Sequence, residues 1–197
     1  MYHIKKSGTN NKLLILFHGT GGDAKEMIVF GNKLDPNANL IAIEGDIKQW
    51  RMNRYFIRYE DGGLDLNNLK SQTEKVYSLM LELIEQYKFQ DITISLVGYS
   101  NGANLILNFL KTYEPFYKNA VILHPGVLRE DVEFIPHEAL NVLVTSGVND
   151  QYLSMSQFDE LIKALKTADY NVKATVHQYG HELIDEEVQK VIKFISK

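Results

Sequence analysis

Three residues of this chain could together perform nucleophilic catalysis: Ser100, Asp150 and His181. Ser100 lies in the run Gly98-Tyr99-Ser100-Asn101-Gly102, directly after a short apolar segment. A glycine on each side suits a turn so tight that larger side chains would collide with the surrounding backbone. A serine hydroxyl is a weak nucleophile, so it needs a base within hydrogen-bonding reach and a third group that orients the base. The rest of the chain must supply both partners.

His181 is the predicted base. It follows a predicted strand over residues 172–177 and precedes the last predicted helix, so it lies in a loop at the edge of the sheet. His177 is less suitable, because it lies within that strand and its side chain is committed to one face. In chains with this strand–turn–helix serine, the order along the sequence is serine, acid, histidine. His181 satisfies that order.

Asp150 is the predicted acid, because it follows Gly147 at the end of a predicted strand over residues 142–145. Its carboxylate would hold the imidazole in the useful tautomer and stabilise its charged form. The other acids, which lie on a predicted helix, at its exit or in an unassigned loop, are Asp159, Asp169, Asp131 and Glu133. The pair in the unassigned loop remains a fallback.

An oxyanion hole is the fourth requirement, because attack on an acyl carbon places negative charge on the carbonyl oxygen. The backbone N–H groups of Asn101 and Thr20 are the predicted donors. Thr20 belongs to the loop His18-Gly19-Thr20-Gly21-Gly22, in which glycines let the backbone aim its N–H groups at the pocket. His18 is expected to hold this loop, and His18, Gly19 and Gly21 are also candidate substrate contacts. A phosphate-binding role is less favoured, because the residues that complete phosphate-binding motifs do not follow.

Four further residues are candidate substrate contacts: Arg51, Arg54, Phe56 and His124. The first three belong to an irregular aromatic segment between residues 44 and 67, which is either a partial lid over the acyl site or a plug beside the core. If it is a lid, Arg51 and Arg54 would meet an acidic group on the substrate. His124 follows a predicted strand over residues 120–123 and either borders the pocket or only makes a turn.

Short apolar segments alternate with amphipathic segments along the whole chain, which predicts an α/β fold. The predicted strands cover residues 12–17, 40–43, 92–97, 120–123, 142–145 and 172–177, and the predicted helices cover 24–34, 69–87, 101–110, 156–168 and 185–195. This alternation is typical of a parallel sheet covered by helices on both faces. No linker or repeat interrupts it, so one domain over residues 1–197 is expected. Ligands of such sheets bind beyond the carboxyl ends of the strands.

The composition narrows the class of protein. The chain has 197 residues, no cysteine and a net charge of −4, with a sequence pI near 5.9. These values predict a soluble cytoplasmic protein that binds no nucleic acid, because phosphate neutralisation requires a clustered basic face. No apolar run reaches the roughly 20 residues of a membrane helix. A homodimer is left open.

At these residues the chain resembles the phospholipase/carboxylesterase family of α/β-hydrolases, which includes acyl-protein thioesterases and small bacterial carboxylesterases. The matching segments are 17–22, 98–102, 147–150 and 180–181, and the arginine-rich aromatic segment 51–56 is similar to the bacterial branch. The resemblance implies a mostly parallel sheet without a large cap, and a serine esterase that needs no metal or cofactor. Asn101 and Thr145-Ser146 depart from residues that are frequent in the family, but neither departure affects Ser100, Asp150 or His181.

The sequence therefore predicts a serine carboxylesterase that hydrolyses small carboxylic esters through an acyl-enzyme. An acyl-protein thioesterase or lysophospholipase-type deacylase is the alternative within the same chemistry. A hydrolase fold that binds a small ligand or a protein without catalysis is the alternative of another class.

Overall fold

The computed structural model describes residues 1–126 and 128–196. The strands in these ranges are β1 (His3–Lys6), β2 (Lys12–Phe17), β3 (Asn39–Ile43), β4 (Ile47–Gln49), β5 (Met52–Arg54), β6 (Thr93–Tyr99), β7 (Asn119–Leu123), β8 (Asn141–Gly147) and β9 (Asn171–His177). The helices are α1 (Ala24–Leu34), α2 (Leu66–Gln86), α3 (Asn101–Leu110), α4 (Met155–Thr167) and α5 (Asp185–Ile195). Each helix and strand that the sequence predicts is present, with ends that differ by a few residues.

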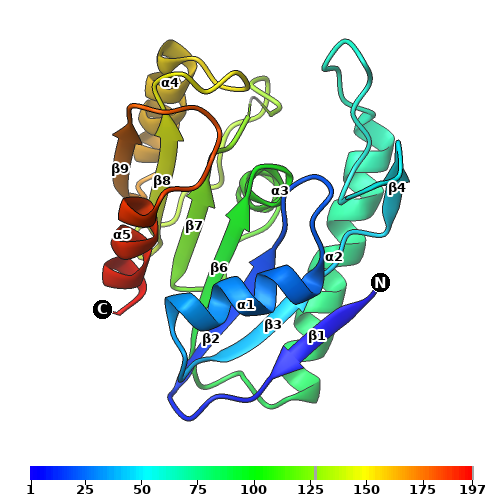
Figure 1. The fold of residues 1–197 in the computed structure, drawn as a ribbon, viewed down its shortest axis with the longest axis vertical. Helices are drawn as coiled ribbons and strands as arrows, with labels where there is room; N and C mark the ends of the chain where they lie inside the picture. Colours follow the sequence, from blue (N-terminus) through cyan, green and yellow to red (C-terminus); the bar gives the residue numbers. More distant parts are fainter. Residues whose placement is uncertain (127, 197) are drawn as a thin grey trace.

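Seven of these strands form one sheet in the order β1-β3-β2-β6-β7-β8-β9. β1 pairs antiparallel with β3, and every other pair of neighbours is parallel. Parallel neighbours bring their carboxyl ends to one edge of the sheet, which lies at the top of Figure 1. The register places Tyr99 beside Leu123 and Gly147 beside His177 at that edge. The predicted α/β architecture with a mostly parallel sheet is confirmed.

Helices cover both faces of the sheet. α1 and α5 lie in front of it, and α2, α3 and α4 lie behind it (Figure 1). Each face has its own apolar cluster: Leu14 and Leu16 of β2 pack toward α1 and α5, whereas Leu13, Ile15 and Phe17 pack toward the other helices. The central strands are apolar at successive positions because both of their faces are buried.

The segment between residues 44 and 67 contains a small hairpin that the sequence did not predict. β4 and β5 pair with each other outside the main sheet, and Trp50 and Arg51 form their turn with φ angles of 50° and 66°. The loop over residues 57–64 then rises above α2 (Figure 1), and an isolated bridge between Arg58 and Leu64 closes its base. At its tip Gly62 has a φ of 85°, and a Cβ there would meet nothing within 4 Å.

β1 is a second element that the sequence did not predict. It has four residues, of which none is fully buried, and it lies on the edge of the sheet.

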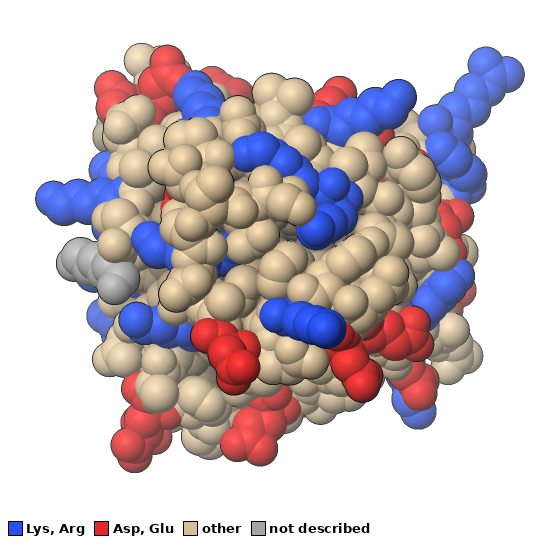
Figure 2. Space-filling model, turned by 90° about the horizontal axis from the view of Figure 1, so that it is seen from below, with Lys and Arg blue, Asp and Glu red and all other residues tan. Residues whose placement is uncertain are grey.

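At the end of the molecule opposite the carboxyl edge of the sheet, Lys and Arg side chains are interspersed with Asp and Glu side chains (Figure 2). Among the described residues, no helix has the length and apolar character that a membrane span requires.

Candidate active site

Ser100 occupies a strained turn between β6 and α3. Its φ of 51° and ψ of −108° lie outside the usual regions for a residue with a Cβ, at a cost of roughly 1–3 kcal/mol. The neighbouring glycines make the turn sterically feasible, because a Cβ on Gly98 would lie 2.5 Å from the carbonyl oxygen of Gly102. A Cβ on Gly102 would lie 2.3 Å from the carbonyl oxygen of Phe17. The turn therefore places the Ser100 hydroxyl at the carboxyl edge of the sheet.

Ser100, His181 and Asp150 form one hydrogen-bonded chain. Oγ of Ser100 lies 2.8 Å from Nε2 of His181, and Nδ1 of His181 lies 2.8 Å from Oδ2 of Asp150. The Tyr99 hydroxyl donates to the backbone oxygen of His181 at 2.7 Å and so fixes the loop that carries the imidazole. The structure thus brings together a hydroxyl, an imidazole and a carboxylate from three separate strand ends.

The Asp150 carboxylate is held in its ionised form. Burial alone would raise its pKa, but hydrogen bonds from the Tyr152 backbone N–H, from His124 and from His181 outweigh burial and lower it. The Tyr152 N–H donates to Oδ1 at 2.9 Å, and both imidazoles contact Oδ2. An ionised Asp150 accepts the Nδ1–H of His181, which leaves Nε2 free to accept a proton from Ser100.

The loop over residues 18–22 lies beside Ser100. The Gly102 N–H donates to the carbonyl of His18 at 3.0 Å, and a Cβ on Gly19 would lie 3.5 Å from Cβ of Ser100. The Gly21 N–H donates to the carbonyl of Asn53 at 2.9 Å, with a φ of 84° that glycine tolerates. This arrangement sets the loop that carries Thr20 next to the start of α3, where the Asn101 N–H lies.

The side chains of His18 and Asn101 hold this region together. Nδ1 of His18 lies 2.6 Å from the carbonyl of Gly19, and Nε2 accepts from the Gly45 N–H at 2.9 Å. Burial lowers the pKa of His18, which is consistent with a neutral ring that has both nitrogens engaged. Oδ1 of Asn101 accepts from the Tyr55 N–H at 2.8 Å. The residue that departs from the family pattern thus links α3 to the hairpin segment.

His124 is not at the pocket wall where the sequence placed it as a candidate substrate contact. It is 0% exposed, its Nδ1 lies 3.0 Å from Oδ2 of Asp150, and its Nε2 lies 3.1 Å from Oε1 of Glu187. Burial alone would lower its pKa, but the hydrogen bonds to Glu187 and Asp150 outweigh burial and raise it. The sequence missed this contact because Glu187 lies on α5, far along the chain, and no local pattern marks it as buried.

His124, His177 and Glu187 are close enough to be considered as metal ligands. Nδ1 of His177 is already engaged, because it accepts a hydrogen bond from the Tyr179 N–H at 3.1 Å. Nε2 of His177 lies 3.2 Å from Oε2 of Glu187. His124 faces a carboxylate with each ring nitrogen. The ring nitrogens of His124 and His177 therefore all have hydrogen-bonding partners within the protein.

The arginine-rich aromatic segment divides between the core and the surface. Phe56, a candidate substrate contact, is fully buried in the apolar cluster behind the sheet beside Tyr55, so at this position the plug interpretation holds and the lid interpretation is wrong. Arg51 lies on the exposed turn of the hairpin. Arg54 is buried, with an exposed fraction of 8%.

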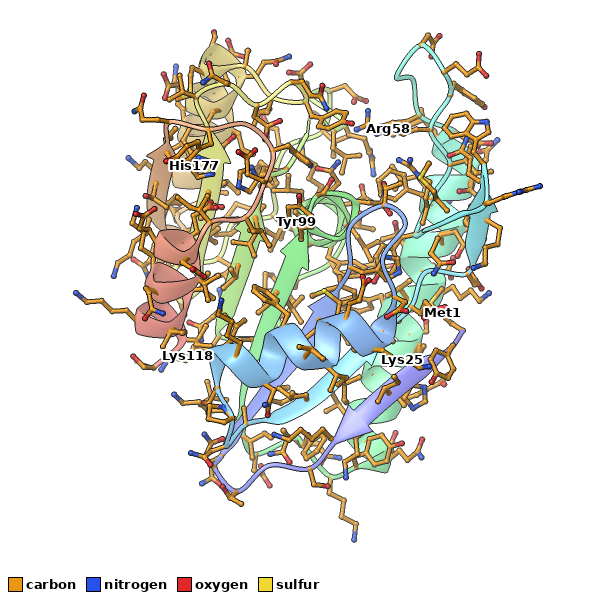
Figure 3. The ribbon with its side chains drawn as sticks, in the orientation of Figure 1. Met1, Lys25, Arg58, Tyr99, Lys118 and His177 are labelled. Carbon is orange, nitrogen blue, oxygen red and sulfur yellow. The ribbon has the colours of Figure 1, made fainter. Side chains whose placement is uncertain are left out.

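Two residues that the sequence reasoning did not select also lie at this edge of the sheet. The Tyr152 ring packs edge-on against the His181 ring, with centroids 4.6 Å apart. Arg58 lies at the same end of the molecule as Tyr99 and His177, on the side of the hairpin (Figure 3). The position of Tyr152 two residues after Asp150 was the available signal, whereas nothing near Arg58 distinguished it from a surface arginine.

Comparisons with known proteins agree with this architecture. The chain is 30% identical over 190 residues to MhqD of Bacillus subtilis (strain 168), a protein to which a hydrolase activity is provisionally assigned, and the match covers 96% of this chain and 95% of that protein. The structure of a Bacillus cereus carboxylesterase superposes with a TM-score of 0.92 at 30% identity, covering 98% of this chain and 92% of the other.

A protein of unknown function from Agrobacterium tumefaciens, Atu2452, superposes with a TM-score of 0.91 at 29% identity, covering 99% of this chain and 95% of the other. A sequence model of the phospholipase/carboxylesterase group matches residues 3–197. With the strained turn at Ser100 and the mostly parallel sheet, these matches mean that the chain belongs to the phospholipase/carboxylesterase family of α/β-hydrolases.

Proposed function

We propose that this protein is a serine carboxylesterase that hydrolyses carboxylic esters through an acyl-enzyme. The observation that carries the proposal is the chain of two 2.8 Å contacts that joins Ser100 to His181 and His181 to Asp150. Membership of a carboxylesterase family supports ester hydrolysis as the reaction class. Small carboxylic esters are the proposed substrates.

In the proposed mechanism, Nε2 of His181 removes the Ser100 proton as Oγ attacks the acyl carbon. Negative charge then develops on the carbonyl oxygen, which accepts hydrogen bonds from the N–H groups of Thr20 and Asn101. Collapse of this intermediate breaks the ester bond, and His181 gives its proton to the leaving alcohol. The same imidazole then deprotonates a water molecule, which attacks the acyl carbon. The bond from the acyl carbon to Oγ breaks, the carboxylic acid is released, and His181 returns the proton to Ser100.

A serine probe and an activated ester test the proposal. We expect the protein to be labelled by a fluorophosphonate and to hydrolyse 4-nitrophenyl acetate, and Ser100→Ala to lose labelling and at least about 10⁴-fold in kcat. Ser71→Ala, on the exposed surface of α2, is the matched control and should behave as the wild type. Equal turnover by the wild type and Ser100→Ala would refute the mechanism, and a silent wild type would favour the non-catalytic binding alternative.

A further inference from the structure

We propose that Arg54 and Arg58 form a subsite for an anionic group of the substrate, so that the esters this protein selects carry an ionised carboxylate. This inference rests on the proposed function, because it places the subsite beside the ester that Ser100 attacks. It differs from the prediction made from the sequence, which paired Arg54 with Arg51. The structure replaces Arg51 with Arg58, which lies on the loop that follows the hairpin.

Arg54 is fixed close to the proposed nucleophile by its two neighbours in the chain. The carbonyl of Asn53 accepts from the Gly21 N–H at 2.9 Å, and the Tyr55 N–H donates to the Asn101 side chain at 2.8 Å. The backbone of Arg54 therefore lies between the loop of Thr20 and the residue that follows Ser100. Such short anchors on both sides fix the backbone position from which its guanidinium extends.

The Arg54 side chain is largely buried without an acidic partner. Nε donates to the carbonyl of Phe56 at 3.4 Å, and within the described part of the chain no carboxylate forms an ion pair with Arg54. A buried charge ordinarily has a partner, because removal of its hydration is costly. The remaining donors of Arg54 are thus available to an anion that enters from solution.

Arg58 and the backbone of Tyr152 both lie beside Gly126. A Cβ on Gly126 would lie 3.8 Å from Nη2 of Arg58 and 3.6 Å from the carbonyl oxygen of Tyr152. Nη1 of Arg58 donates to the carbonyl of Gly62 at 2.9 Å, which anchors the side chain. Burial lowers the pKa of Arg54, the charge of Arg58 lowers it further, and Tyr152 acts in the opposite direction. Two guanidinium groups and a phenol are therefore close neighbours.

The positive charges of Arg54 and Arg58 repel each other in this partly desolvated site. A bound carboxylate would offset that repulsion, because it attracts both guanidinium groups. Arginine stays protonated in proteins, and its planar fork of donors matches the two oxygens of a carboxylate. The Tyr152 ring connects this place to the reaction centre, since it contacts His181 at a centroid distance of 4.6 Å. The anionic group should thus be separated from the scissile ester by a short spacer.

Paired esters that differ only in charge test the subsite. One pair is the 4-nitrophenyl monoester of adipic acid and its methyl ester, which places the carboxylate on the acyl side. The other pair is 3-(butyryloxy)benzoate and its methyl ester, which places the carboxylate on the leaving group. We expect kcat/KM to favour the acid over the methyl ester by about 10- to 100-fold in one of the two pairs, because charge-assisted hydrogen bonds to two arginines form.

The variants Arg54→Gln and Arg58→Gln should bring this acid-to-ester ratio close to one. Arg51→Gln should retain the ratio, and Lys25→Gln on the exposed surface of α1 controls for the loss of one positive charge. Because Arg54 is buried, its variant is checked by thermal unfolding. If Arg54→Gln does not fold, the subsite is tested with Arg58→Gln alone. Free adipate should then inhibit the Arg58→Gln variant competitively with a Ki about 10-fold higher than for the wild type.

The outcomes separate this inference from the proposed function. A wild type that hydrolyses the neutral esters through Ser100 but shows no preference for the acid in either pair overturns the subsite alone. The same conclusion follows if Arg51→Gln removes the preference and Arg58→Gln does not. The proposed function fails instead if no ester is hydrolysed and the serine probe does not react.

Discussion

The His124 ring lies between two carboxylates inside the protein, and both contacts involve the charge of the ring. Asp150 and Glu187 each have a pKa that burial would raise but that hydrogen bonds from His124 help to lower. The pKa of His124 is raised, because the hydrogen bonds to Glu187 and Asp150 stabilise the charged ring by more than burial destabilises it. A doubly protonated ring can donate to both carboxylates at once. The carboxylate that contacts His181 is therefore itself held by a second imidazole.

The charge of His124 should make the stability of the protein depend on pH. A raised histidine pKa stabilises the fold fully below the unfolded value of 6.5, and this contribution is lost as the pH rises through the higher folded value. The lowered carboxylate pKa values act in the other direction, because their contribution is lost as the pH falls below the unfolded values of 3.8 and 4.5. These three groups together favour the folded state most between about pH 5 and 6.5.

Glu187→Gln tests this network. We expect the free energy of unfolding to fall by about 3–5 kcal/mol near pH 6, because the change leaves a buried partner without its counter-charge. The decline of stability above pH 6.5 should become smaller, because His124 loses the carboxylate that raises its pKa. Denaturant titrations between pH 5 and 9 measure both effects.

The control for this change is Asp185→Asn, at the start of the same helix. Asp185 pairs with Lys33 at 2.8 Å, but its side chain is 90% exposed, so solvent screens the interaction. It should change stability little and leave the pH dependence as in the wild type. An unaltered alkaline decline in Glu187→Gln would mean that His124 is not charged in the folded protein.

At the scale of elements, the turn between β6 and α3 depends on close approach of three backbone segments. Gly98 faces the carbonyl of Gly102, and Gly102 faces the carbonyl of Phe17 at the end of β2. A side chain at either position would push the start of α3 away from the sheet, and the Ser100 hydroxyl would move with it. The glycines therefore set the geometry of the site and also the packing of α3.

Gly102→Ala should destabilise the protein and abolish its hydrolytic activity. The added Cβ would lie 2.3 Å from a backbone oxygen, and backbone cannot move aside as a flexible side chain can. We expect a loss of about 1–3 kcal/mol or more in the free energy of unfolding, as for overpacked cores. Gly126→Ala is the matched case, since its nearest neighbour would be 3.5 Å away. Equal stability of the two variants would contradict the steric argument.

The hairpin of β4 and β5 could not be predicted from local sequence patterns. Its strands have three residues each, and its turn requires positive φ at Trp50 and Arg51, which are not typical turn residues. Its position is set by long-range bonds, such as the Tyr55 hydroxyl donating to the carbonyl of Ile43 at 2.6 Å. Neither the spacing of apolar residues nor the residues of the turn indicate such contacts, so the sequence predicted only an irregular segment here.

At the scale of the whole molecule, the main sheet and its helices were predictable because burial on both faces imposes strong patterns. The strand ends then brought Ser100, Asp150 and His181 to one edge, and the structure places them within hydrogen-bonding distance of one another. The contacts of Glu187, Arg58 and His124 were not predictable. They depend on how α5, the loop over residues 57–64 and β7 pack in three dimensions, which no local period encodes.

The acyl-chain preference belongs to this same scale. A cavity of about 440 Å³ lies between α3, α4, Gly126 and residues 128–136, but its lining includes none of Ser100, Asp150 and His181. We therefore expect kcat/KM for 4-nitrophenyl esters to stay level or fall from butyrate to octanoate. If the chain entered the cavity, four additional methylenes at about 0.8 kcal/mol each would raise kcat/KM by more than about 100-fold. Such a rise would favour the lysophospholipase or thioesterase alternative.

The loop over residues 57–64 also indicates how this scaffold could be extended. Its base is closed by the bridge between Arg58 and Leu64, and a side chain added at Gly62 would meet nothing within 4 Å. Lengthening a surface loop costs little free energy, because the entropy of closure grows slowly with length. A segment inserted beside Gly62 would thus extend the loop at the carboxyl edge of the sheet while the sheet and helices beneath kept their shape, which makes this tip a natural starting point for engineering new substrate ranges.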